Sequence, residues 1–219
     1  MLIDKIKLIS GHYEKVHACN KCFNCFGCSF KHDSLKVRRK VLEGALDSKI
    51  FIIAQSIAER TQRLSGLPYT YTNGQLSTTG KKLDKYLSLI GYTIIPNNGR
   101  KLVYSSDIVH CYPGKKNNGD GDNKPTSQEI KNCYDWLTKE IEIIKPKVLL
   151  LLGKVAAETF LSLFCKEELD NFELLLNKKF KIKINHLNLN IFILPHPASM
   201  YPNLSNIYKT TMDLIKLSF

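Results

Sequence analysis

The stretch PKVLLLLGKVAAETFL, residues 146–161, decides the fold class of this sequence. Its first half, Lys147–Gly153, is a short run of Val and Leu, typical of a strand that is buried on both faces of a sheet. Pro146 ends any helix that precedes it, and the residues after Gly153 have the spacing of an amphipathic helix. A buried strand that leads directly into a helix favours an α/β fold with a parallel sheet.

The same alternation extends in both directions along the chain. Strands are predicted at KIFIIAQ (49–55), LVYSSDIVH (102–110) and KIKINHLNLNIFILP (181–195), the last holding one or two strands. Helices are predicted at KKLDKYLSLIGY (81–92), QEIKNCYDWLTKEIEIIK (128–145), KVAAETFLSLFCKEEL (154–169) and NIYKTTMDLIKL (206–217). Gly91 fits a helix stop, and Ser127 is the expected cap of the helix that follows it.

Composition limits the class of protein. The chain has 219 residues, 43% of them hydrophobic and 24% charged, which excludes a disordered or fibrous protein. We see no linker or repeat, so we predict one domain over residues 1–219, with a cysteine-rich segment at about residues 15–35. No apolar run is long enough for a bilayer and no signal peptide is visible, so we expect a cytoplasmic protein without a membrane partner. Nothing implies a protein partner, and we expect a monomer.

The net charge of +12 suits a polyanionic partner such as nucleic acid, because Lys and Arg that neutralise phosphates release counterions. A lysine-rich solvated surface would give the same net charge, so charge alone does not identify the partner.

Seven cysteines in an intracellular chain argue against a disulfide framework. Four of them form overlapping C-x2-C pairs in CNKCFNCFGC: Cys19, Cys22, Cys25 and Cys28. This spacing lets two thiolates converge on one metal ion. Cys165 lies on a predicted amphipathic helix and is read as a small buried hydrophobic residue rather than a ligand.

Three further segments follow predicted strands: AQSIA (54–58), HCYPG (110–114) and HPAS (196–199). In an open parallel sheet, ligand sites lie at the carboxyl ends of the strands. These segments are therefore the first candidates for a functional site.

The order of these segments resembles the uracil-DNA glycosylase superfamily, in particular its iron–sulfur-containing family 4. AQSIA and GLPY (66–69) stand where that family has Gly-Glu-Ala-Pro-Gly and Gly-x-Pro-Phe, and DIVHCYPG (107–114) stands where it has Asn-x-x-Lys-Cys-Arg-Pro-Pro. A cysteine-bearing helix, EIKNC, then PKVLLLLG and His-Pro-Ala at 196–198 follow in the family's order. The resemblance runs from about Cys19 to Met200. It implies a three-layer α/β/α fold with a central, mainly parallel four-stranded sheet, and DNA as the partner.

The resemblance also implies a [4Fe–4S] cluster held by four cysteines. Two of them map onto Cys111 and Cys133. For the other two, distance to the first strand favours Cys25 and Cys28, and the pair at residues 19 and 22 remains the alternative. Four thiolates also suit zinc, which stays open as the alternative metal.

The catalytic roles follow from the resemblance in the same way. His196 would donate a hydrogen bond toward O2 of the departing base, where negative charge develops, although a structural histidine between two prolines is the alternative. Tyr69 matches the aromatic that stacks on the flipped base. Gln55 and Ser56 depart from the family's first motif; Ser56 can orient a water, and Glu59 is a spare carboxylate.

Asp107 bears on the choice of base, because the family commonly has Asn at this position. An ionised carboxylate only accepts hydrogen bonds, so it matches the N4 amine of cytosine better than O4 of uracil. Ala58 leaves space beside C5 of the base. We therefore lean toward a modified cytosine, such as a C5-modified base of phage DNA removed in defence. Uracil in base-excision repair is the near-equal alternative, and a DNA-binding relative without activity is a third.

DNA contacts are expected from two loops. Met200 or Tyr201 would fill the gap that the flipped base leaves. Lys115 and Lys116 would contact phosphates, although either can equally belong to a solvated loop.

Overall fold

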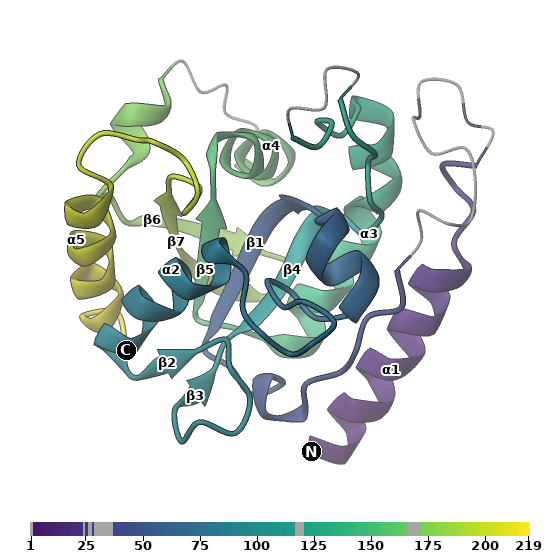
Figure 1. Cartoon of the computed structure of the whole chain (residues 1–219), viewed down its shortest axis with the longest axis horizontal. Helices are drawn as coiled ribbons and strands as arrows, with labels where there is room; N and C mark the ends of the chain where they lie inside the picture. Colours follow the sequence, from purple (N-terminus) through teal and green to yellow (C-terminus); the bar gives the residue numbers. More distant parts are fainter. Residues whose placement is uncertain (1, 24, 26–27, 29–36, 117–120, 166–170) are drawn as a thin grey trace.

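The fold is built on a five-stranded sheet in the order β4-β1-β5-β7-β6 (Figure 1). The computed structural model describes residues 2–23, 25, 28, 37–116, 121–165 and 171–219. The strands are β1 (Ile50–Ser56), β4 (Tyr104–Val109), β5 (Val148–Leu152), β6 (Phe180–Ile184) and β7 (Leu187–Leu194). Strands β4, β1, β5 and β7 pair in parallel, and β6 pairs antiparallel with β7.

The sheet has five strands, so the expectation of four was wrong. The additional strand, β6, arises because residues 180–194 fold into a hairpin in which Ile184 pairs with Leu187. The two-residue turn starts at Asn185, whose φ of 52° lies in the left-handed region that asparagine tolerates. Lys181 and Lys183 are exposed on β6, and lysines on an edge strand discourage pairing with another chain.

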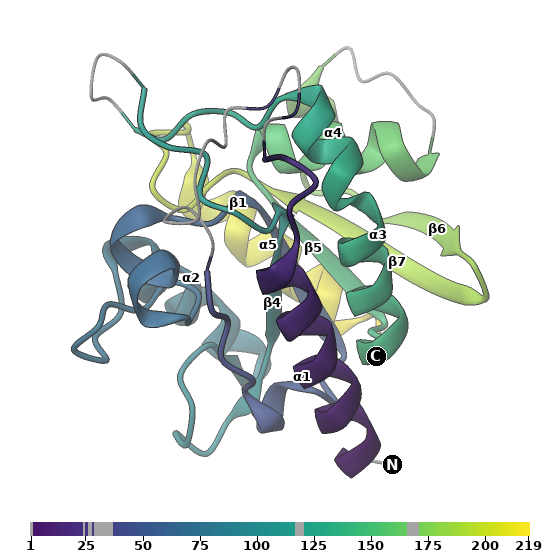
Figure 2. The same ribbon diagram turned by 90° about the vertical axis from the view of Figure 1, so that its right-hand side faces the viewer.

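Helices cover both faces of the sheet, which confirms the three-layer α/β/α prediction (Figure 2). On one side, α3 lies against β4 and α4 against β5, with α1 packed on α3; on the other, α5 lies against β7 and α2 packs on α5. The α-helices are α1 (Leu2–Ala18), α2 (Thr78–Leu87), α3 (Ser127–Ile144), α4 (Lys154–Cys165) and α5 (Leu204–Lys216). Among these described helices, none has both the length and the hydropathy needed to cross a membrane.

Short elements complete the chain. They are η2 (Glu43–Ala45), η3 (Glu59–Arg63, one turn of π-helix), η4 (Ser88–Ile90), η5 (Phe172–Leu175), and the strands β2 (Tyr92–Thr93) and β3 (Lys101–Leu102), which pair in parallel. Gly91 ends η4 with a φ of 77°, so the predicted helix stop is confirmed.

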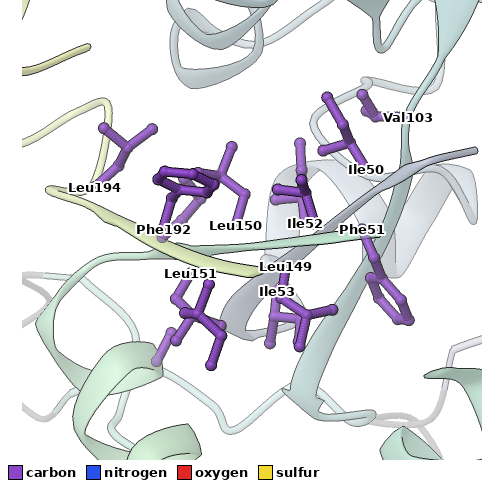
Figure 3. Packing of buried hydrophobic residues seen from close by; sticks show 14 of the residues in the cluster. Ile50, Phe51, Ile52, Ile53, Val103, Leu149, Leu150, Leu151, Phe192 and Leu194 are labelled. Atoms are coloured by element: carbon purple, nitrogen blue, oxygen red, sulfur yellow. The ribbon is translucent and has the colours of Figure 1, made fainter. Parts of the chain in front are cut away.

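Along each central strand of the sheet, successive buried side chains point to opposite faces. Ile52, Leu150 and Phe192 point to one face, whereas Ile53 and Leu151 point to the opposite face (Figure 3). All five side chains are almost completely buried. Helices on both faces therefore explain why the central strands read as continuous apolar runs rather than as alternating patterns.

The structure corrects two expectations about helices. The N-cap of α3 is Thr126 rather than Ser127: its hydroxyl accepts from the backbone of Glu129, whose carboxylate accepts from the backbone of Thr126. No helix was predicted before the first strand, yet Leu2–Ala18 form α1, with Asp4 in its first turn and Lys15 in its last, as the helix dipole favours.

A buried charge cluster joins α1, the segment after residue 37, β4 and α3. One carboxylate oxygen of Glu140 lies 3.0 Å from His110 Nε2 and 3.4 Å from both Arg39 Nη1 and His12 Nε2. Arg39 also donates to the Ser106 hydroxyl at 2.8 Å. Burial alone would raise the pKa of Glu140, but the positive charge of Arg39 and the contacts of the two histidines hold it well below its usual value.

Glu140→Gln is expected to lower the free energy of unfolding by about 3–5 kcal/mol at neutral pH, because it removes the carboxylate that pairs with the buried charge of Arg39. The folded-state pKa of Glu140 lies below its unfolded value, so the stabilisation is present above the unfolded pKa and is lost as pH falls through the folded one. The deficit of the variant should therefore shrink on acidification. Urea unfolding followed by circular dichroism at several pH values measures it.

Glu158→Gln is the matched control, because this carboxylate lies on α4 with 39% of its side chain exposed. Its unfolding free energy should change by no more than about 0.5 kcal/mol. Equal small losses in both variants would contradict the role given to Glu140.

Candidate active site and metal centre

The candidate active site is a cavity of about 610 Å³ at the carboxyl ends of β1 and β4. Parallel pairing places Ala54 of β1 opposite Asp107 of β4, so the polar residues at the carboxyl ends of the two strands lie at the same edge of the sheet. The structure brings all six predicted catalytic and base-binding residues, and one predicted phosphate contact, to the wall of this cavity: Gln55, Ser56, Ala58, Tyr69, Asp107, His196 and Lys115.

Asp107 is the most buried acid of this cavity, with 3% of its surface exposed. One of its oxygens, Oδ2, accepts a hydrogen bond from Gln62 Nε2 at 2.9 Å. Burial raises the pKa of Asp107, against the lowering effects of Arg39, His110 and the Gln62 hydrogen bond. Gln62 was missed by sequence reasoning, and only its place four residues after the first motif could have drawn attention to it.

Tyr69 stands in the wall of the cavity with an unusual backbone. Its φ of 59° lies in the left-handed region, which an aromatic residue rarely adopts and which occurs preferentially at functional sites. Its carbonyl accepts from Ser77 N at 2.8 Å, and a side chain at Gly80 would approach Tyr69 Cβ to 2.9 Å. The start of α2 therefore holds Tyr69 in place. Burial, with a contribution from Asp107, raises the pKa of Tyr69, so the hydroxyl remains protonated.

His196 follows β7 and presents its ring to the cavity. Its Nδ1 accepts a hydrogen bond from the backbone N–H of Ala198 at 3.3 Å. In the neutral ring the proton therefore resides on Nε2, which is a donor. The surrounding protein lowers the pKa of His196 by desolvation although the residue as a whole is exposed, so the neutral form prevails at neutral pH.

The first motif is tied to the loop that follows β4. Gln55 Nε2 donates to the Asn123 carbonyl at 3.2 Å. In the wall of the cavity, Glu59 Oε2 lies 3.2 Å from Lys115 Nζ. The charge of Lys115 is thus balanced by Glu59, whereas the side chain of Lys116 is exposed outside the cavity.

The loop after His196 separates the two wedge candidates. Met200 is fully exposed, at 100% of its surface. Tyr201 is half-buried and meets Phe172 edge-on at 6.2 Å between ring centroids. Of the two candidates, Met200 is therefore the more exposed side chain.

The candidate metal centre lies where α3 meets the cysteine-rich segment. Burial raises the pKa of the Cys133 thiol, and the neighbouring thiols of Cys111, Cys22 and Cys19 raise it further. Asn132, beside it on α3, donates to Cys22 Sγ at 3.3 Å and to Cys28 Sγ at 3.7 Å. The start of α3 and the end of β4 thus meet the N-terminal cysteines, and Cys19 and Cys22 are among the thiols that raise the pKa of Cys133.

The donor set fits a metal cluster that takes thiolate ligands. Burial and mutual repulsion raise the pKa of Cys22, Cys28 and Cys133, and a cation bound among them would relieve both effects. Cys165 is half-buried against the apolar core, which agrees with the role of a small hydrophobic residue expected for it.

Comparisons with known proteins agree with this geometry. The family model described as "Uracil DNA glycosylase superfamily" matches residues 42–213. A Type-4 uracil-DNA glycosylase of Archaeoglobus fulgidus is 26% identical over 204 residues, covering 92% of this chain and 88% of that protein. A Type-4 uracil-DNA glycosylase of Sulfurisphaera tokodaii is 25% identical over 216 residues, covering 98% of this chain and 83% of that protein. A Type-5 uracil-DNA glycosylase of Pyrobaculum aerophilum is 28% identical over 120 residues, covering 52% of this chain and 48% of that protein.

The matched residues include the parallel sheet, the cavity and His196. The match therefore covers most of the chain and the whole of the candidate active site. The chain belongs to the uracil DNA glycosylase superfamily and is a DNA glycosylase, a hydrolase of N-glycosyl bonds.

Proposed function

We propose that this protein removes uracil from DNA by hydrolysing the N-glycosidic bond of a flipped-out deoxyuridine. The observation that carries the proposal is the neutral His196, whose Nε2 is a donor in the same cavity as Tyr69 and Asp107. The relatives named as uracil-DNA glycosylases support uracil as the base.

His196 would act on the departing base. Negative charge grows on O2 of uracil as the bond breaks, and a donor already aimed at that oxygen stabilises the transition state. The hydrogen bond from Ala198 to Nδ1 holds the ring in the tautomer that this requires. The lowered pKa keeps the ring neutral, so it donates a hydrogen bond without delivering a full positive charge to the pocket.

The remaining walls would hold the base and admit water. Tyr69 provides a ring for stacking, and Ala58 leaves room beside C5. Ser56 would orient the attacking water, with the Glu59 carboxylate close by in the same cavity. A transition state with oxocarbenium character needs little help from a base, so the absence of the family's acid from the first motif is compatible with activity.

Two findings favour uracil over the modified cytosine suggested by Asp107. The preference for cytosine assumed that Asp107 has no hydrogen-bond donor beside it. In the structure, Gln62 Nε2 donates to Asp107 Oδ2 at 2.9 Å, so a donor stands beside the acceptor. The relatives' names give no support to a modified cytosine or to phage defence, and we do not retain either.

DNA would be engaged on the cavity side of the sheet. Met200 is the proposed wedge, and Lys116 is the more available of the two predicted phosphate contacts because Glu59 pairs with Lys115. The monomeric state and the cytoplasmic location expected from the sequence remain predictions.

We infer further that Cys19, Cys22, Cys111 and Cys133 hold a [4Fe–4S] cluster, in place of the pair Cys25 and Cys28 favoured by sequence distance. The support is proximity: the thiols of Cys111, Cys22 and Cys19 lie close enough to Cys133 to raise its pKa, and Asn132, beside Cys133, donates to Cys22 Sγ at 3.3 Å. A cluster bound there would cross-link the N-terminal segment to the β4–α3 connection. Its role would be structural, and it would take no part in hydrolysis of the glycosidic bond.

Cys22→Ser should abolish the visible iron–sulfur absorbance and the bound iron, which we expect at about four per chain in the wild type. Cys25→Ser, the matched control, should retain both. Iron and sulfide analysis of the anaerobically purified variants measures the outcome. Loss in Cys25→Ser with retention in Cys22→Ser would restore the first assignment, and zinc without iron in the wild type would exclude the cluster.

His196→Gln should lower kcat for uracil release by about 100- to 1,000-fold, because it removes a donor aimed at the developing charge. The measurement is single-turnover release from an oligonucleotide with one uracil. His186→Gln, exposed in the β6–β7 turn, should retain full activity. Undiminished activity in His196→Gln would refute this role, and a wild type that binds DNA but releases no base would favour the non-catalytic relative.

A further inference from the structure

The base-reading position of this cavity lacks a hydrogen-bond donor of its own. Uracil presents a donor at N3 and an acceptor at O4, so its reader needs an acceptor beside a donor. Asparagine has both groups on one carboxamide, whereas the carboxylate of Asp107 offers only acceptors when ionised. A second group must supply the donor if the cavity is to take uracil.

Gln62 is placed to supply it. The residue is 4% exposed and lines the same cavity as Asp107, Tyr69 and His196. Its Nε2 lies 2.9 Å from Asp107 Oδ2. A carboxamide nitrogen carries two hydrogens, so one bond to Asp107 leaves a second N–H for the base.

The backbone around Gln62 is fixed, which keeps its side chain at this place. Gln62 lies in η3, a single π-turn, and such turns are frequent at functional sites. Its carbonyl accepts from Gly66 N at 2.9 Å, and Arg63 N donates to the Ala58 carbonyl at 3.1 Å. The turn thus connects the first motif to the loop that carries Tyr69.

We propose that Gln62 is a base-reading residue: its amide donates to O4 of uracil while Asp107 accepts from N3–H, so that the two side chains together replace one asparagine. The inference rests on the proposed uracil activity. It also explains selectivity, because cytosine in the same pose would place its N3 acceptor against Asp107 and its N4 donor against Gln62. Both contacts would then be mismatched, and buried mismatches are costly.

A double-mutant cycle tests this pairing. Gln62→Leu should lower kcat/KM for uracil release by about 10-fold or more when Asp107 is present, because the O4 donor is lost. In an Asp107→Asn background the asparagine brings its own donor, so the same substitution should change kcat/KM by no more than about 2-fold. Asp107→Asn alone should remain active on uracil.

Two further variants serve as a substitute and as a control in this experiment. Gln62→Met has nearly the length of glutamine without its polar atoms, and it serves if the leucine variant does not fold. Gln75→Leu, in an exposed loop outside the cavity, controls for the loss of a glutamine elsewhere and should leave kcat/KM unchanged.

The outcomes separate the two proposals. Equal losses from Gln62→Leu in both backgrounds would show that Gln62 only supports the fold, and no loss in either would show that it does not act; each overturns the inference. If the wild type releases no uracil, it is the proposed function that fails. Cytosine release that appears in Gln62→Leu would support the selectivity of the pair.

Discussion

The parallel register between β1 and β4 is the constraint on which the site depends. It sets Ala54 beside Asp107, so that the first motif and the base-reading residue leave the sheet at the same edge. A slip of one residue would turn Asp107 to the opposite face of the sheet. The neighbouring strand contributes through Gly153, whose φ of 88° ends β5 and whose missing side chain would lie 3.4 Å from His196 Cβ. The apolar run that decides the fold thus ends at a glycine beside His196, the proposed catalytic residue.

Two buried carboxylates show how the surroundings assign different roles to the same chemical group. Glu140 meets Arg39 and two histidines, which hold its pKa well below the usual value and keep it an anion at neutral pH that joins α1, β4 and α3. Asp107 is also buried, but its direct partner is the neutral amide of Gln62, and its pKa is raised. Glu140 therefore stabilises the fold, whereas Asp107 lies where it could accept a hydrogen bond from a nucleobase in the cavity.

The sequence predicted much of this, for physical reasons that also explain the failures. Continuous apolar runs identified β1 and β5 because strands buried on both faces have no polar alternation. The fifth strand was ambiguous because β6 is an edge strand with exposed lysines. Helix α1 was not predicted because it buries only Ile9, His12 and Val16, so its apolar periodicity is weak. The motifs placed the residues that line the cavity. They could not identify Gln62, whose importance depends on a contact with Asp107 across 45 residues of chain, nor decide between cysteine pairs that share one spacing.

The most direct test of the account is the identity of the released base. Purified protein would be incubated with matched DNAs that carry uracil, cytosine, 5-hydroxymethylcytosine or its glucosylated form, and free bases would be identified by mass spectrometry. The account predicts release of uracil and of no cytosine derivative, because Asp107 and Gln62 together present an acceptor beside a donor to N3 and O4. Release of a cytosine derivative without uracil would contradict it, and would mean that an ionised Asp107 reads the base by itself.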